Sequence, residues 1–130
     1  MSFAWAEYLA LAEALFRARA TFADEEACCR AAISRAYYAA FCTARNYARD
    51  NEGLTLPRSD RGRVHQVVIN YYNQHSRRQH RVVGWNLSQL RHRRNQADYD
   101  DPNMQRVDVV TRHALNQARQ VFTALRQLSP

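Results

Sequence analysis

Apolar residues recur at intervals of three and four along most of the chain, which is the period of one face of an α-helix. In the C-terminal stretch, every third or fourth residue from Val107 to Leu128 is apolar. A second clear stripe precedes it and contains Val83, Leu87 and Leu90. No segment shows the alternation of apolar and polar residues expected of a strand. The pattern predicts an all-α protein, built as an up-and-down bundle of four to five helices.

Capping residues indicate where five helices begin and end. Asp24 is typical of a helix start, and Gly53 is typical of a helix end. Asp101-Pro102 indicates another start, because proline is favoured at the first helical position. The expected helices span about residues 3–20, 24–50, 61–75, 82–99 and 102–128, with the polar run 76–80 as a connector. In the first helix the expected apolar stripe is Ala4, Tyr8, Leu11, Leu15 and Ala18.

Length and composition indicate one domain without a membrane span. We expect a single helical domain over residues 1–130. The chain has no run of 18 apolar residues and no signal-peptide pattern, so we expect a cytoplasmic protein. Cys28, Cys29 and Cys42 are expected to be small core thiols. No metal or cofactor is expected, because no cysteine or histidine falls at ligand spacing.

Positive charge is concentrated in the middle of the chain. All 19 basic residues are arginines. Nine of them lie between Arg58 and Arg94 with one acid, Asp60, so this window carries a charge of +8. The other ten arginines and eleven acids give −1. The window is interpreted either as a solvated basic face or as a surface that binds a polyanion such as RNA or a nucleotide.

One arginine interrupts the apolar stripe of the expected helix 82–99. After Leu87 and Leu90, the stripe continues with Arg94 and then Ala97. A charge on a buried stripe costs on the order of several kcal/mol unless it is paired or faces a wet cleft. Arg94 is therefore the first candidate for a functional residue.

Other polar residues lie on or near the face of Arg94. At 100° per residue, Asp98 lies about 40° from Arg94, Arg91 about 60° and Asn95 about 100°, with Tyr99 further round at about 140°. Arg94 and Asp98 are four residues apart, which suits a salt bridge. Arginine binds phosphate with a two-pronged fork, and asparagine can orient it. This face is interpreted as a phosphate-binding cleft, a polar seam between two chains, or a surface ion pair.

A second arginine interrupts the central helix. Arg35 lies in the segment Ser34-Arg-Ala-Tyr-Tyr-Ala-Ala-Phe41, three residues before Tyr38. Tyrosines in a central helix are usually packed in the core with the hydroxyl at its rim. Arg35 is harder to place in a core, so it is a further candidate for phosphate binding.

Three blocks of residues together resemble a known family. They are Ser34 to Phe41, then Val64-His-Gln-Val-Val68, then Leu90-Arg-x-x-Arg-Asn-x-Ala-Asp-Tyr99. In this order they are similar to the HEPN superfamily, and most similar to its small stand-alone bacterial and archaeal branch with an Arg-Asn-x-Ala-Asp-Tyr signature. The resemblance covers roughly residues 24–128. It implies a homodimer whose motif faces meet, in a bacterial toxin–antitoxin or defence system, with a small nucleotidyltransferase antitoxin as a partner.

The resemblance also implies residues for RNA cleavage without a metal. Nuclease members carry Arg-Asn-(x)3-His, and Arg94 and Asn95 match its first two positions. Tyr99 stands in place of the histidine, with Asp98 before it. A free tyrosine ionises only near pH ~10, so it accepts protons poorly at neutral pH but can still donate one. The expected residues for binding RNA phosphate are Arg91, Arg35 and His65.

Two functions follow as alternatives. The first is a HEPN-type protein that binds RNA or a nucleotide, with weak metal-independent endoribonuclease activity. The second is a non-catalytic module in which the helix around Arg94 forms a dimer or partner interface, and the Arg94–Asp98 pair sets the register. Salt separates the two, because phosphate contacts weaken steeply with ionic strength and a packed helical interface does not.

Overall fold

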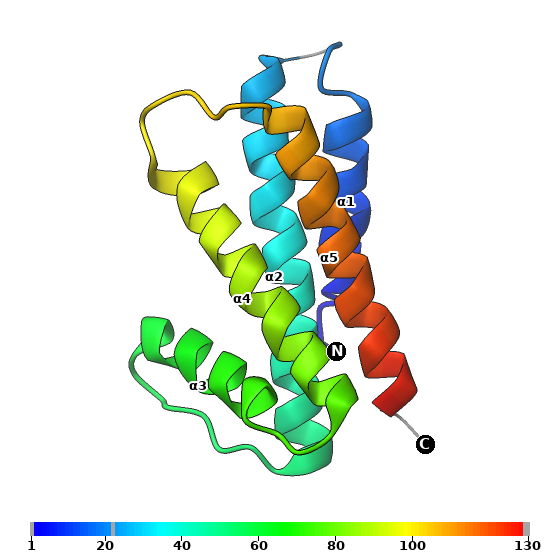
Figure 1. Cartoon of the computed structure of the whole chain (residues 1–130), viewed down its shortest axis with the longest axis vertical. Helices are drawn as coiled ribbons and strands as arrows, with labels where there is room; N and C mark the ends of the chain where they lie inside the picture. Colours follow the sequence, from blue (N-terminus) through cyan, green and yellow to red (C-terminus); the bar gives the residue numbers. More distant parts are fainter. Residues whose placement is uncertain (1, 22, 129–130) are drawn as a thin grey trace.

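All regular secondary structure in the described part of the chain is α-helix. The computed structural model describes residues 2–21 and 23–128, and no strand occurs among them. Its helices are α1 (Ala6–Arg17), α2 (Glu25–Glu52), α3 (Arg61–Asn73), α4 (Arg78–Tyr99) and α5 (Val107–Leu128). Figure 1 shows α1, α2, α4 and α5 running up and down, with α3 lying across one end. The predicted all-α bundle is confirmed. The predicted domain also includes Met1, Phe22, Ser129 and Pro130, which lie outside the described residues.

The central helix is α2, which packs against α1, α4 and α5. It starts where predicted, because the Asp24 carboxylate accepts a hydrogen bond from the Ala27 backbone N–H at 2.9 Å. It ends where Gly53 adopts the left-handed conformation at φ 71°. The predicted core thiols are confirmed as buried and free: Cys28, Cys29 and Cys42.

One cluster of buried side chains joins the helices. The predicted apolar stripe of α5 faces this cluster. The stripe of α4 is also buried, and it includes Arg94, which is only 7% exposed. No helix in the described part of the chain is long and apolar enough to cross a bilayer.

The predicted apolar face of the first helix is only partly right, because Leu15 packs against the core but Leu11 does not. Leu11 is 44% exposed, whereas Ala12 is fully buried and Leu9 packs against the core. The helix is also shorter than expected, since it spans residues 6–17. This alanine-rich segment offers apolar residues on several sides, so the face that packs on α2 is chosen by tertiary contacts.

The fourth helix begins earlier than predicted. The run 76–80 was expected to be a polar connector, yet α4 starts at Arg78 and His80 is fully buried in its first turn. The Nε2 atom of His80 lies 2.8 Å from a carboxylate oxygen of Glu52 at the end of α2. A polar residue can be buried when it finds a partner, and composition alone does not reveal that partner.

The third helix lies very close to α4. A side-chain carbon added at Gly84 would lie 2.4 Å from Oδ1 of Asn73 and 2.6 Å from its backbone nitrogen. Only glycine leaves room for this approach. The contact sets the position of α3, which carries His65.

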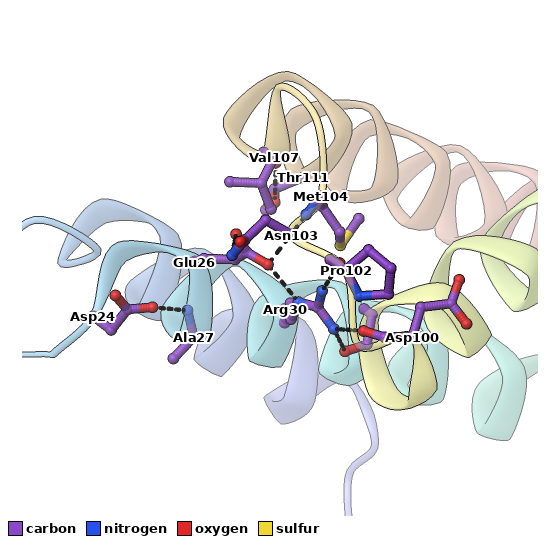
Figure 2. A network of polar contacts seen from close by, with 11 residues as sticks. Asp24, Glu26, Ala27, Arg30, Asp100, Pro102, Asn103, Met104, Val107 and Thr111 are labelled. Atoms are coloured by element: carbon purple, nitrogen blue, oxygen red, sulfur yellow. Dashed lines mark hydrogen bonds and ion pairs between the residues drawn. The ribbon is translucent and has the colours of Figure 1, made fainter.

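The fifth helix begins later than predicted. Pro102 lies in a bend and is not the first helical residue, because α5 starts at Val107. Figure 2 shows that the connection is held by Arg30 of α2. Its Nη1 donates to the carbonyl oxygens of Ala97 at 3.1 Å and Asp100 at 2.7 Å, and its Nη2 donates to Pro102 at 2.8 Å.

Glu26 completes this clamp from the previous turn of α2. Its carboxylate accepts from Arg30 Nε at 2.8 Å, from Asn103 Nδ2 at 3.0 Å and from the Met104 backbone N–H at 3.2 Å. The backbone after α4 is thus satisfied by side chains of α2 instead of by a new helical turn. This explains the late start of α5.

Candidate functional site

The three sequence blocks meet where α4 packs on α2. The first block lies on α2, the second supplies His65 from α3, and the third ends α4. We call the polar and aromatic side chains at this junction the Arg94 cluster. Its members are Ser34, Arg35, Tyr37, Tyr38, His65, Arg91, Arg94, Asp98 and Tyr99.

Aromatic rings surround the Arg94 guanidinium. Its central carbon lies 5.3 Å from the ring centre of Tyr37, 5.1 Å from that of Tyr38 and 5.8 Å from that of Tyr99. All three distances are within the range of about 6 Å at which a cation is attracted to the face of a ring. The rings lower the cost of burying this charge without using its hydrogen-bond donors.

Those donors are poorly matched. The nearest carboxylate, of Asp98, is 3.9 Å from Nη1 of Arg94, and the Tyr99 hydroxyl is 3.4 Å away. Well-formed bonds from arginine to a carboxylate measure about 2.7–2.9 Å. The Nε atoms of Arg94 and Arg91 are both buried without a partner. Two neighbouring guanidinium groups therefore lack close acceptors.

The carboxylate of Asp98 is held by α2. Its Oδ2 accepts a hydrogen bond from Ser34 Oγ at 3.1 Å. Ser34 Oγ also accepts from Nη2 of Arg35 at 3.2 Å. The Arg35 guanidinium lies over the rings of Tyr8, at 4.9 Å, and Tyr38, at 5.2 Å. Arg35 thus adds a third positive charge to the cluster.

Tyr37 and His65 form a hydrogen-bonded pair within the cluster. The Tyr37 hydroxyl lies 2.5 Å from Nδ1 of His65. Burial raises the pKa of Tyr37 well above its ordinary value, although Arg91 and Arg94 oppose the rise, so the hydroxyl stays protonated and shares a hydrogen bond with Nδ1. Burial, followed by the charges of Arg91 and Arg94, lowers the pKa of His65 to about 4. His65 is therefore neutral at pH 7, with a single proton on its ring nitrogens.

The predicted catalytic residues are only partly brought together. Arg94, Asp98 and Tyr99 lie side by side, since Tyr99 is the last residue of α4 and its hydroxyl reaches back to Arg94. The Tyr99 side chain is otherwise open to solvent, with 71% of the residue exposed. Asn95 is exposed and makes no hydrogen bond to any described residue.

Of the predicted phosphate-binding residues, Arg35 shares the Tyr38 ring with Arg94, and Arg91 acts with Arg94 on the pKa of His65. His65 itself is neutral and can offer only a neutral hydrogen bond. Sequence reasoning missed how the tyrosines of α2 contribute. Tyr37 is fully buried, as the core interpretation predicted, yet its ring also faces Arg94. This contact could have been predicted from the spacing. Arg94 lies on the buried stripe of α4, so its side chain must contact residues of the central helix, where Tyr37 and Tyr38 lie.

A separate group of possible metal ligands was also missed. Glu52, His75 and His80 place one donor atom each within 4.8 Å of one another. However, the two imidazole rings are stacked with centres 3.5 Å apart and planes only 5° from parallel. A metal ion lies close to the plane of each ring that binds it, so two such rings cannot share one ion. With Tyr71 donating to Glu52 at 2.5 Å, the arrangement fits a hydrogen-bonded network better than a metal centre.

Comparison of the chain with known protein families, with curated proteins and with solved structures finds no match in any of the three. The resemblance to HEPN proteins rests on the three residue blocks alone. The contacts of the Arg94 cluster are therefore the basis for a functional proposal.

Proposed function

We propose that this chain is a HEPN-type protein that binds RNA or a nucleotide through phosphate contacts in the Arg94 cluster. The observation that carries the proposal is the state of Arg94, which is 7% exposed and has no acceptor closer than 3.4 Å. A buried charge without a partner is costly. A phosphate oxygen supplies the missing acceptor, because arginine and phosphate match in charge and geometry.

The electrostatics of the surrounding residues support an anionic ligand. The cluster holds three arginines, Arg35, Arg91 and Arg94, and Asp98 is its only carboxylate. The window from Arg58 to Arg94 adds further arginines on α3 and α4. A concentration of one sign of charge attracts a polyanion and speeds its association.

Weak endoribonuclease activity without a metal is the finer part of the proposal. Next to a bound phosphate, the Tyr99 hydroxyl can donate a proton to a leaving oxygen. The Asp98 carboxylate, held by Ser34, can accept the proton of the ribose 2′-hydroxyl as that oxygen bonds to phosphorus and the bond from phosphorus to the leaving 5′ oxygen breaks. Arg94 would stabilise the negative charge that develops on the phosphorus oxygens.

Binding is tested by fluorescence anisotropy with labelled single-stranded RNA over a range of salt concentrations. Arg94→Ala is expected to weaken binding about tenfold or more and to flatten the salt dependence. Arg93→Ala is the matched control, because Arg93 lies on the same helix but its Nε bonds to Gln117 of α5 at 3.1 Å. Equal losses in both variants would mean that only bulk charge matters, and the site assignment would then be wrong.

Cleavage is tested separately with end-labelled RNA in the presence of a chelator. We expect slow cleavage by the wild-type chain and none by Arg94→Ala. Tyr99→Phe should reduce cleavage but leave RNA affinity nearly unchanged, because it removes only a hydroxyl. If RNA remains intact with the wild-type chain while binding is normal, the protein binds without cleaving.

A second function, a helical dimerisation module, is favoured by one observation on α4. Trp85, His92 and Tyr99 are spaced seven residues apart and are all exposed. A spacing of seven returns to nearly the same helix face, as in helices that pair. If this row forms a homodimer interface, Trp85→Ala should lower the mass found by sedimentation at any salt concentration. A nucleotidyltransferase antitoxin, implied by the resemblance alone, stays a prediction.

A further inference from the structure

A cavity of about 490 Å³ opens beside the Arg94 cluster. It lies between the start of α1 and the facing sides of α2 and α3. This volume falls in the range of cavities that hold small planar ligands, about 300–1,000 Å³. Its lining includes Trp5, Tyr38, Phe41, Arg45, Arg61 and His65.

The cavity and the Arg94 cluster share two side chains. Tyr38 lines the cavity and lies 5.1 Å from the Arg94 guanidinium carbon. His65 lines it as well and is held by Tyr37 of the cluster. A ligand that places a phosphate at Arg94 can therefore place its neighbouring group in the cavity.

The walls of the cavity are flat and aromatic. His65 lines the cavity and stacks on Phe41 with ring centres 4.1 Å apart and planes 11° from parallel, so Phe41, which is only 2% exposed, supports the His65 ring and offers little of its own face to a ligand. Trp5 forms another wall, with the Arg45 guanidinium carbon 5.7 Å from its ring. Unpaired nucleic-acid bases are commonly bound by stacking on such rings and on arginine.

The polar groups of the cavity are mostly donors. Tyr37 occupies Nδ1 of His65, and Nε2 of that ring makes no hydrogen bond to a described residue, so it is left for a ligand. Arg45 and Arg61 add guanidinium donors, and no carboxylate lines the cavity. This lining suits a base that presents carbonyl oxygens, such as uracil or guanine, better than adenine.

We propose that this cavity binds one unpaired base with carbonyl acceptors, uracil or guanine, from an RNA strand whose phosphate is held at Arg94. The inference rests on the proposed function and adds the part of the ligand that the Arg94 cluster does not explain. It also accounts for the closeness of an aromatic cavity to a group of unmatched arginines.

The test uses the fluorescence of Trp5. Trp5 and Trp85 are the two tryptophans of the chain, so Trp85→Phe leaves Trp5 as the sole reporter. The probes are an oligouridylate of about ten nucleotides, an oligoadenylate of equal length and a ribose-phosphate strand without bases. Oligouridylate should change Trp5 emission and bind at least about fivefold more tightly than the strand without bases. Oligoadenylate should fall between the two.

Paired variants locate the effect. The Arg61→Gln variant should bind oligouridylate severalfold more weakly than the wild-type chain does. The Arg61→Gln and Arg63→Gln variants should bind the strand without bases with similar affinity. Arg63 is the matched control, because it is exposed on the same helix two residues away and does not line the cavity.

The outcomes separate this inference from the proposed function. If all three strands bind equally and Trp5 emission does not change, the base-binding cavity is wrong while phosphate binding stands. If oligoadenylate matches oligouridylate in affinity and emission, the preference for carbonyl-bearing bases is wrong. If no strand binds, the proposed function fails, and the cavity assignment fails with it.

Discussion

Two arginines connect α2 with α4, and their donors are used in opposite ways. Arg30 has a side chain that is 20% exposed, and it makes four hydrogen bonds of 2.7–3.1 Å to Glu26 and to three carbonyl oxygens. Arg94 has a side chain that is 8% exposed, yet its nearest oxygens are 3.4 and 3.9 Å away. The more deeply buried arginine is therefore the one with poorer partners.

Under the proposed function, this difference separates a structural role for Arg30 from a binding role for Arg94. A guanidinium with matched donors holds the connection between α4 and α5 in place, and each charge-assisted bond stabilises the fold. A guanidinium with unmatched donors costs stability, which a ligand restores when it supplies the acceptors.

Removing the matched arginine should cost the most stability. Arg30→Met leaves three carbonyl oxygens without this donor and removes one of the three donors to the Glu26 carboxylate, so we expect the free energy of unfolding to fall by about 2–4 kcal/mol. Urea denaturation measures this loss. Arg49→Met is the control, because Arg49 pairs with Asp50 where both side chains are about half exposed, and the loss should stay below about 0.5 kcal/mol. Similar losses in the two variants would contradict the role given to the clamp.

The close packing of α3 on α4 should show the next largest effect. Gly84→Ala places a carbon 2.4 Å from Asn73 Oδ1, so we expect a loss of about 1–3 kcal/mol in the free energy of unfolding. Gly62→Ala is the matched control, since the nearest atom is 3.6 Å away and alanine favours a helix. That variant should be neutral or slightly more stable. A neutral Gly84→Ala would mean that α3 moves freely relative to α4, and the position of His65 would then not be fixed.

The unmatched charge should also appear in the pH dependence of stability. The pKa of His65 is lowered from 6.5 to about 4, first by burial and then by Arg91 and Arg94. Between these values the unfolded chain binds a proton that the folded chain does not, so stability should fall as the pH drops from 6.5 to 4.

His65→Asn isolates this effect by urea denaturation at several pH values. Its amide can still accept from Tyr37 but does not titrate, so stability should fall less steeply between pH 6.5 and 4 than in the wild-type chain. The pKa of His75 is also lowered, but His75 is present in both proteins and its contribution cancels. Identical slopes would show that His65 is not buried beside the two arginines.

Much of the fold could be predicted from the sequence, because helical period and capping are local. Asp24 and Gly53 mark the ends of α2, and the stripe of α5 is buried as expected. The failures involve contacts between distant segments. Pro102 does not start a helix because Arg30, 72 residues away in sequence, binds its carbonyl oxygen. His80 can be buried because its Nε2 atom is paired with the carboxylate of Glu52.

The site was predictable in one respect and not in another. Arg94 could be found because it breaks a periodic stripe, and the structure buries it as that stripe requires. Its aromatic surroundings and the tautomer of His65 depend on how α2 and α3 face α4, and no local pattern encodes that geometry. The exposed position of Asn95 shows that a motif can place residues next to each other in sequence without bringing them into one site.

The central claim is that Arg94 is kept for a ligand and not for the fold, and one measurement tests it most directly. This is the free energy of unfolding of Arg94→Met in urea, with and without oligouridylate. Methionine removes the charge but keeps an unbranched apolar chain, so the free variant should be as stable as the wild type or more stable. Oligouridylate should stabilise the wild-type chain and have much less effect on the variant. A loss of about 3 kcal/mol without RNA, comparable to that of Arg30→Met, would contradict the account and make Arg94 a structural residue.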